Sequence, residues 1–198
     1  ILDPRKYWDV NVFGSLQVIS AMQSVGVKNL IFSSSATIYS LTNKMPVTEE
    51  SLIGDCISPY GWSKFAAEAL FSQCVNASGE INCVFLRYFN PVGADPNGLI
   101  RECKAGVGTN LFPAILDSIE GVKDKLLVFG TDYQTIDGTC LRDFIHISDL
   151  ATGHIAAIEY MNEKSGICEA FNLGRGEGLS ILQILEKFEQ HLNTKLPI

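Results

Sequence analysis

The sequence predicts an α/β fold in which helices cover a parallel sheet. Two observations carry this prediction. Stretches with apolar residues three or four apart, typical of amphipathic helices, alternate along the chain with short uninterrupted apolar runs. Runs of the second kind are typical of strands that a parallel sheet buries on both faces. Repeated alternation of this sort is the pattern of right-handed strand–helix–strand units, so a layered α/β architecture follows.

The first half of the chain contains two helices and two strands. A stripe of apolar residues predicts a helix over residues 7–25, which Gly26 ends. A strand over residues 29–32 follows, and a polar loop then leads to a second helix over residues 60–74. The apolar run 83–86 predicts a second buried strand.

The second half begins with a loop. Proline and glycine crowd residues 91–108, and a segment of this length without periodicity predicts a long, functional loop. The alternation then resumes. In chain order, the sequence predicts a helix over 111–120, strands over 126–129 and 143–147, a helix over 148–161, a strand over 170–173 and a last helix from Leu179.

The composition limits the partners of the protein. The formal net charge of the 198 residues is −7, and Lys and Arg form no cluster suited to phosphates, so we expect no nucleic-acid partner. No apolar run approaches the ~20 residues that span a bilayer, so we expect no membrane association. Because no signal segment opens the sequence, a cytoplasmic location is expected.

The cysteines indicate a reducing environment. Six are scattered along the chain without a C-x-x-C pair or histidines at zinc spacing, which argues against a metal site and a redox pair. We expect reduced thiols in the core, as is usual in the cytosol. They are Cys56, Cys74, Cys83, Cys103, Cys140 and Cys168.

Tyr60 and Lys64 lie just inside the start of the second predicted helix. Their spacing of four places both side chains on one helix face. A free tyrosine is a poor base at neutral pH because its pKa is about 10, but a neighbouring ammonium favours the phenolate. An isolated Tyr and Lys four residues apart on a helix are usually a pair of surface side chains. Here Ser33–Ser35 follow a buried strand, and ligands of open α/β sheets bind beyond the carboxyl ends of the strands. The combination predicts a reaction site.

A dinucleotide-binding sheet is expected to begin with a strand and a glycine-rich turn, whereas this sequence begins with a predicted helix. Its one glycine cluster, residues 174–178, follows a predicted strand near the end of the chain. We interpret this cluster as an ordinary loop in preference to a phosphate cradle.

Six segments resemble the UDP-glucose 4-epimerases, a family of extended short-chain dehydrogenases/reductases. They are Ser33–Tyr39, Ser58–Lys64, Arg87–Ala94, Asn110–Pro113, Val128–Tyr133 and Asp137–His146. The resemblance implies a partial Rossmann-like, doubly wound parallel sheet with part of a smaller α/β substrate-binding domain. It also implies reversible hydride transfer from C4 of a UDP-sugar to bound NAD, which interconverts UDP-glucose and UDP-galactose.

The resemblance implies a role for each matching residue. Tyr60 is the expected base, Ser35 binds the sugar 4-hydroxyl, and Lys64 holds the nicotinamide ribose. The implied cofactor contacts are Asn11, Ser33, Ser34, Tyr60, Lys64 and Phe89. The implied substrate contacts are Ser35, Tyr60, Asn90, Asn110, Leu111, Leu127, Phe129 and Arg142. A guanidinium suits diphosphate because its planar fork gives paired bonds. Core packing is an equal alternative for Leu127 and Phe129, as is a structural role for Asn11.

The resemblance also predicts the domain organisation. Residues 1–92 are expected to form the C-terminal portion of the NAD-binding domain. Residues 93–198 are expected to bind the nucleotide sugar, with 143–162 returning to the first domain. Because the glycine fingerprint and a C-terminal segment of the family are missing, we expect the isolated chain to be an inactive fragment that binds NAD weakly. The family implies a homodimer through the helices that contain Val12 and Ala66.

Two rival functions remain open. A nucleotide-sugar dehydratase or decarboxylase of the same family shares Tyr60 and Lys64, but a dehydratase is expected to carry Asp-Glu where this sequence has Ala36-Thr37. The other rival is a non-catalytic nucleotide-sugar-binding protein. Three residues depart from the family pattern: Ser40, Trp62 and Gly108. On helical geometry Trp62 points away from the catalytic face, so we expect catalysis to tolerate it.

Overall fold

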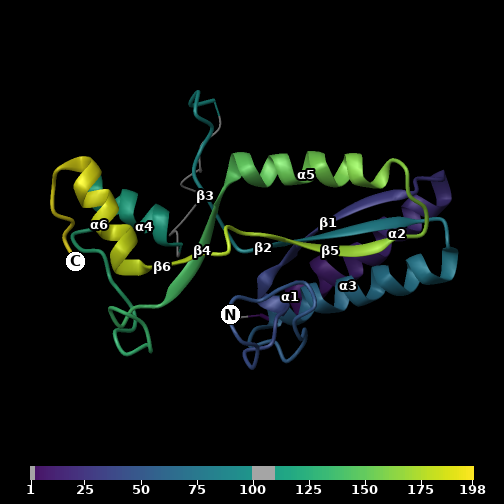
Figure 1. Ribbon diagram of the computed structural model, residues 1–198, viewed down its shortest axis with the longest axis horizontal. Coiled ribbons are helices and arrows are strands. Elements are labelled where there is room, and N and C mark those ends of the chain that lie inside the picture. The colour runs from purple at the N-terminus through teal and green to yellow at the C-terminus, as the bar shows by residue number, and fades with distance from the viewer. Residues whose placement is uncertain (1–2, 100–109) are drawn as a thin grey trace. The chain divides into compact units, whose positions relative to one another are not determined.

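The computed structural model describes residues 3–99 and 110–198 (Figure 1). The chain forms two compact units. The first unit runs to Phe89 and resumes over Asp149–Leu173, and the second comprises Asn90–Ser148 and Gly174–Ile198. The segment that returns to the first unit thus includes a strand as well as a helix, because this strand pairs with the first unit's sheet.

The first unit is built on a three-stranded parallel sheet with the order β1-β2-β5. Its strands are β1 (Asn29–Ser35), β2 (Asn82–Tyr88) and β5 (Cys168–Leu173). Helices α2 (Gly14–Val25) and α3 (Pro59–Ser78) cover one face, and α5 (Ile147–Met161) covers the other (Figure 1). The predicted parallel α/β layers are therefore confirmed.

Alternating residues of β2 feed a core on each face of this sheet. Cys83 and Phe85 pack with residues of α2 and α3 such as Ile19 and Phe71. Val84 and Leu86 point the other way and pack with Ala157 and Met161 of α5. The first six residues of β2 are buried, which explains the uninterrupted apolar run over residues 83–86 at its centre.

The N-terminal helix is confirmed, but it is not uniformly α-helical. A short α1 (Arg5–Tyr7) leads into a π-helical segment, η1 (Trp8–Phe13), which continues directly into α2. Gly26 ends the helix in the left-handed conformation at a φ of 75°, as a glycine after a helix often does. Apolar periodicity does not reveal the π-helical segment, because a single wider turn shifts the stripe only slightly.

The second unit combines a small mixed sheet with two packed helices. Its strands are β3 (Asn90–Val92), β4 (Leu141–His146) and β6 (Gly178–Ser180); β4 pairs parallel with β3 and antiparallel with β6. Helices α4 (Leu111–Ile119) and α6 (Ile181–Leu192) share one apolar core, which includes Ile115 and Leu185.

Two details of the predicted pattern are wrong in the second unit. Residues 126–129 form no strand: Leu126 is buried and donates its backbone N–H to the Pro197 carbonyl at 2.7 Å, whereas Leu127 and Phe129 are 69% and 80% exposed. The last helix begins at Ile181, because Leu179 lies in β6 and Ser180 caps the helix through a capping box.

The predicted loop over residues 91–108 is described only in part. Its first two residues belong to β3, and residues 93–99 form turns and irregular backbone. Gly108 and Cys103 lie outside the described residues. The other five cysteines are free: Cys56 and Cys83 are buried, and Cys74, Cys140 and Cys168 are half-buried. No helix in the described part of the chain is long and apolar enough to cross a membrane.

Candidate active site

Tyr60 and Lys64 lie in the first two turns of α3. Ser58 caps this helix, since its side-chain oxygen accepts the Gly61 backbone N–H at 3.1 Å. The Lys64 ammonium nitrogen lies 5.8 Å from the centre of the Tyr60 ring and 4.8 Å from that of Phe32. The predicted stacking on one helix face is therefore present.

Gly61 allows the start of α3 to approach the end of β1 closely. A Cβ at this position would lie 2.8 Å from the Thr37 carbonyl oxygen and 3.1 Å from the Cys56 Cβ. Thr37 belongs to the short 3-10 helix η2 (Ala36–Ile38), which directly follows β1. The glycine thus holds the first turn of α3 against the segment that follows Ser35.

The Lys64 side chain reaches back to the carboxyl end of β1. Its ammonium donates to the Ser33 carbonyl oxygen at 2.9 Å. Burial lowers the pKa of Lys64, because desolvation disfavours the charged form. One strand carbonyl therefore fixes the position of the ammonium, and within residues 3–99 and 110–198 no other acceptor binds its remaining two N–H groups.

The three serines that end β1 point to alternating sides of the sheet, as successive strand residues do. The Ser33 hydroxyl lies 2.7 Å from the Tyr88 hydroxyl, and Ser33 is exposed. Ser34 is buried, and its hydroxyl donates to the Glu68 carboxylate at 2.5 Å. The Ser34 side chain is therefore directed into the interior beneath α3.

Ser35 occupies the position next to the start of α3. Its hydroxyl oxygen accepts the Thr37 backbone N–H at 3.3 Å and the Thr37 hydroxyl at 3.0 Å. Both bonds use Ser35 as an acceptor. Among the residues that the structure describes, none accepts the Ser35 hydroxyl hydrogen, which leaves it available to a ligand.

Asn11 and Phe89 flank this group. The Asn11 side-chain amide donates to the Ser63 hydroxyl at 2.8 Å, and that hydroxyl donates to the Tyr60 carbonyl at 2.8 Å. Asn11 therefore ties the π-helical segment to α3, which supports the structural alternative for this residue. Phe89 directly follows β2, is half-buried, and donates its N–H to the Leu173 carbonyl at 3.1 Å.

Sequence reasoning missed a buried ion pair beneath these residues. The Arg87 guanidinium binds the Glu68 carboxylate through two bonds of 2.8 and 3.1 Å, and the two side chains are only 5% and 4% exposed. Glu68 lies one helical turn beyond Lys64, and Arg87 opens a family-like motif. Their spacing from the expected site residues is the one signal that the sequence offers.

The residues expected to bind the UDP-sugar are, apart from Ser35 and Tyr60, all in the second unit. The Asn90 side chain donates to the Asp143 carbonyl of β4 at 2.7 Å. Arg142, which precedes Asp143 on β4, is exposed. Asn110 is exposed at the N-cap position of α4, without a side-chain capping bond. Leu111 is half-buried against the core of this unit.

The exposure of Leu127 and Phe129 argues against core packing, one of the two interpretations of these residues. Because they are 69% and 80% exposed, core packing does not account for them within the unit. Large exposed apolar side chains on an irregular segment are suited to stack on or pack against a ligand.

The glycine cluster over residues 174–178 connects β5 to β6 and does not begin a helix. The Asp143 carboxylate accepts the backbone N–H groups of Arg175 and Gly176, each at 2.8 Å. A carboxylate of the chain thus occupies the position that a phosphate would take, which favours the loop interpretation.

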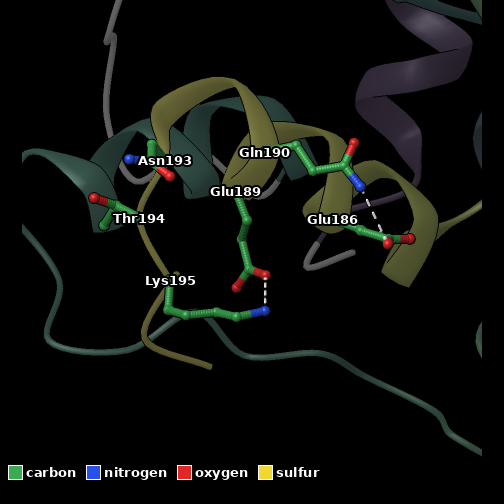
Figure 2. Close-up of a pocket in the computed structure, with 6 residues that line it drawn as sticks. All are labelled: Glu186, Glu189, Gln190, Asn193, Thr194 and Lys195. Carbon is green, nitrogen blue, oxygen red and sulfur yellow. Dashed lines mark hydrogen bonds and ion pairs between the residues drawn. The ribbon is translucent and has the colours of Figure 1, made fainter.

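A hollow of about 310 Å³ lies at the end of α6 (Figure 2). Its polar side chains bind one another: Lys195 pairs with Glu189 at 2.5 Å, and Gln190 donates to Glu186 at 3.2 Å. None of its residues belongs to the predicted site.

Comparisons with known proteins support the resemblance. The model of the NAD dependent epimerase/dehydratase family matches residues 1–174. The UDP-glucose 4-epimerases of Mus musculus and Homo sapiens are each 44% identical over 194 residues, which cover 98% of this chain and 56% of each relative. The chain thus spans little more than half the length of these curated relatives.

Solved structures agree. UDP-glucose 4-epimerase from Bifidobacterium longum in complex with NAD+ and UDP has a TM-score of 0.92 and 39% identity, over 98% of this chain and 57% of that chain. The enzyme from Stenotrophomonas maltophila, with bound NAD and formylated UDP-arabinopyranose, also has a TM-score of 0.92, at 38% identity and the same coverage. The resemblance and the Rossmann-like fold class are confirmed, and the chain belongs to the NAD dependent epimerase/dehydratase family.

Proposed function

We propose that the protein interconverts UDP-glucose and UDP-galactose, with NAD as its cofactor and Tyr60 as the catalytic base. The observation that carries the proposal is the position of the Lys64 ammonium, which is fixed on the Ser33 carbonyl at 2.9 Å and lies 5.8 Å from the Tyr60 ring. A phenol beside a partly desolvated ammonium is a suitable base, because the positive charge favours the phenolate.

The polar groups at the carboxyl end of β1 fit NAD. The Lys64 ammonium retains two N–H groups, which match ribose hydroxyls, and the exposed Ser33 hydroxyl lies on the same strand end. Ligands of open α/β sheets bind at this edge. Asn11 and Phe89 complete the proposed cofactor site. Ser34 contributes to it through its backbone, because its hydroxyl is bound to Glu68.

In the proposed reaction the Tyr60 phenolate takes the proton of the sugar 4-hydroxyl. Ser35 donates its remaining hydrogen to the same oxygen, and Lys64 balances the changing charge on Tyr60. When bound, NAD accepts the hydride from C4 and returns it. The resulting 4-keto sugar rotates in the site, so the hydride returns to its other face. Tyr60 returns the proton to the 4-oxygen, and the configuration at C4 is inverted.

The second unit is proposed to hold the uridine diphosphate. Arg142 is exposed on β4, and its planar guanidinium suits the paired oxygens of a diphosphate. Leu127 and Phe129 offer exposed apolar surface for the uracil ring. Asn90, Asn110 and Leu111 are proposed to complete this group.

A homodimer is proposed to form through the helices that contain Val12 and Ala66. The proposal is supported by large apolar side chains that stay exposed on the first of them: Trp8, Val10, Phe13 and Leu16 are 44%, 71%, 59% and 43% exposed. A Leu16→Asp variant is expected to be monomeric in light scattering.

The five described cysteines are free, which supports a reducing, cytoplasmic location.

Replacing Tyr60 by Phe in the full-length protein tests the proposed function. Removal of a general base is expected to lower the rate of interconversion of the two UDP-sugars by a factor of about 10²–10⁴. The matched control is Trp62→Lys, on the same helix. Trp62 is 40% exposed and packs against Phe65, so the rate of interconversion by this variant is expected to equal that of the wild type. An unchanged rate in Tyr60→Phe would rule out the catalytic role. Release of a dehydrated keto sugar by the wild type would favour the dehydratase alternative.

A further inference from the structure

A chain of short hydrogen bonds runs from the end of β1 through β2 to α5. The Ser33 hydroxyl lies 2.7 Å from the Tyr88 hydroxyl, which lies 2.6 Å from His154 Nε2. His154 Nδ1 lies 2.8 Å from the Leu150 carbonyl oxygen, one turn earlier in α5. The Tyr88 and His154 rings pack at a centroid distance of 5.6 Å. Neither Tyr88 nor His154 has a role in the proposed reaction so far.

The direction of these bonds follows from the far end of the chain. A carbonyl oxygen only accepts, so the bond to Leu150 requires the hydrogen of His154 on Nδ1. In the tautomer that carries its hydrogen on Nδ1, the Nε2 atom is an acceptor, and the Tyr88 hydroxyl donates to it. Since the single Tyr88 hydrogen is used there, the Tyr88 oxygen accepts the Ser33 hydroxyl.

The state of Tyr88 agrees with this direction. Burial raises the pKa of Tyr88, and the neighbouring Tyr60 acts in the same sense, although the bond to Ser33 opposes them. Tyr88 therefore stays protonated, as a hydrogen-bond donor must.

The consequence for Ser33 is a fixed polarity. Its carbonyl accepts the Lys64 ammonium, and its hydroxyl hydrogen is directed to Tyr88. The exposed Ser33 oxygen therefore presents only lone pairs to a ligand, next to an ammonium that presents only N–H groups. A ligand at this strand end must offer a donor to Ser33 and acceptors to Lys64. The carboxamide N–H and the ribose oxygens of a nicotinamide nucleotide meet these requirements.

We infer that Tyr88 and His154 are positioning residues of the proposed cofactor site, which fix Ser33 as a hydrogen-bond acceptor for a donor group of the nicotinamide nucleotide. The inference rests on the proposed function for the identity of this ligand. The direction of the hydrogen-bond chain rests on the geometry of these side chains and does not depend on the ligand.

The tautomer of His154 tests the direction of the chain without any ligand. Two-dimensional ¹⁵N–¹H NMR of the full-length protein, labelled at histidine, distinguishes the two ring nitrogens. The His154 signals are assigned by their loss in a His154→Gln variant. We expect the tautomer with its hydrogen on Nδ1 and none on Nε2. A hydrogen on Nε2 instead would overturn the inference.

Binding of NAD to three variants tests the consequence for the cofactor. In His154→Phe the acceptor is lost, so the Tyr88 hydrogen turns to Ser33 and the Ser33 hydrogen turns to the ligand. The Kd for NAD is expected to rise about five- to tenfold, as for the loss of one hydrogen bond. His154→Gln retains an acceptor oxygen and is expected to restore most of the affinity. Tyr160→Phe is the matched control. It removes a hydroxyl of the same helix, and this hydroxyl donates to Glu169 at 2.6 Å, outside the hydrogen-bond chain, so the Kd for NAD is expected to stay unchanged.

The outcomes separate the inference from the proposed function. Wild-type protein that binds NAD, with a weakened Phe variant and a restored Gln variant, supports the inference. Equal affinity of wild type and His154→Phe overturns it while the proposed function stands. Absence of NAD binding by the wild type overturns both. Should His154→Phe fail to fold by circular dichroism, the wild-type tautomer and the Gln variant still decide.

Discussion

The buried ion pair between Arg87 and Glu68 offers a direct test of how the first unit is stabilised. In Arg87→Met the Glu68 carboxylate keeps its position beneath α3 but loses both guanidinium bonds, of 2.8 and 3.1 Å. Because the Glu68 side chain is only 4% exposed, water cannot replace the two lost bonds. Only the Ser34 hydroxyl remains as a described partner of this carboxylate. The Tyr39 hydroxyl also loses a bond from Arg87 of 3.0 Å.

The magnitude follows from the burial of the charge that remains. Removing one partner of a buried pair costs about 3–5 kcal/mol, because an uncompensated charge is left in the interior. Domains are stable by only about 5–15 kcal/mol, so the variant is expected to lose about a fifth or more of its free energy of unfolding. The double variant Glu68→Leu/Arg87→Met removes both charges, and we expect it to be more stable than Arg87→Met alone.

Urea unfolding of the full-length protein, followed by circular dichroism, measures these free energies. The matched control is Lys28→Met, which breaks the ion pair with Glu80, whose two side chains are 60% and 69% exposed. A change below about 1 kcal/mol is expected there. A similarly small change in Arg87→Met, or a double variant less stable than either single variant, would refute the reasoning.

Three further predictions concern stability. Gly93→Ala is expected to cost about 1–3 kcal/mol in urea unfolding, because φ is 98° and a Cβ would lie 2.3 Å from the His146 ring; an unchanged midpoint would contradict this. Phe71→Ala removes a ring that is 2% exposed, and a loss of about 3–5 kcal/mol is expected, whereas a loss below 1 kcal/mol would show that the core refills the space. Hydrogen bonds from Ser180 and then Thr139 lower the pKa of Asp137. Its stabilising contribution is therefore complete above the unfolded pKa of about 4 and is lost as pH falls through the lower folded pKa. Asp137→Asn should flatten the acid side of a plot of melting temperature against pH, and an unchanged slope would oppose this.

Much of the fold is predictable because most of its elements are long enough to show a period. Helix α3 repeats its apolar pattern over several turns, the strands β1 and β2 show it as short apolar runs at residues 30–32 and 83–86, and all three elements are confirmed. The three-residue strands β3 and β6 contain too few residues for any pattern. The apolar run at residues 126–129 misled for another reason: Leu126 is buried by tertiary packing, without a neighbouring strand.

The candidate site is predictable where its residues are close in sequence. Tyr60 and Lys64 belong to one helix, so their spacing fixes their geometry. Ser34 is different, because which side of a strand faces α3 depends on the tertiary packing that brings Glu68 to it. His154 is separated from Tyr88 by 66 residues, and only the folded structure brings the two together.

The central claim is that the sugar is inverted by removal and return of the C4 hydride, with Tyr60 as base. The fate of deuterium at C4 of UDP-glucose, converted by the full-length protein in ordinary water, tests it most directly. We expect the UDP-galactose formed to keep the deuterium at C4, because the hydride stays within the site. Loss of deuterium to water, at a rate equal to that of epimerisation, would contradict it.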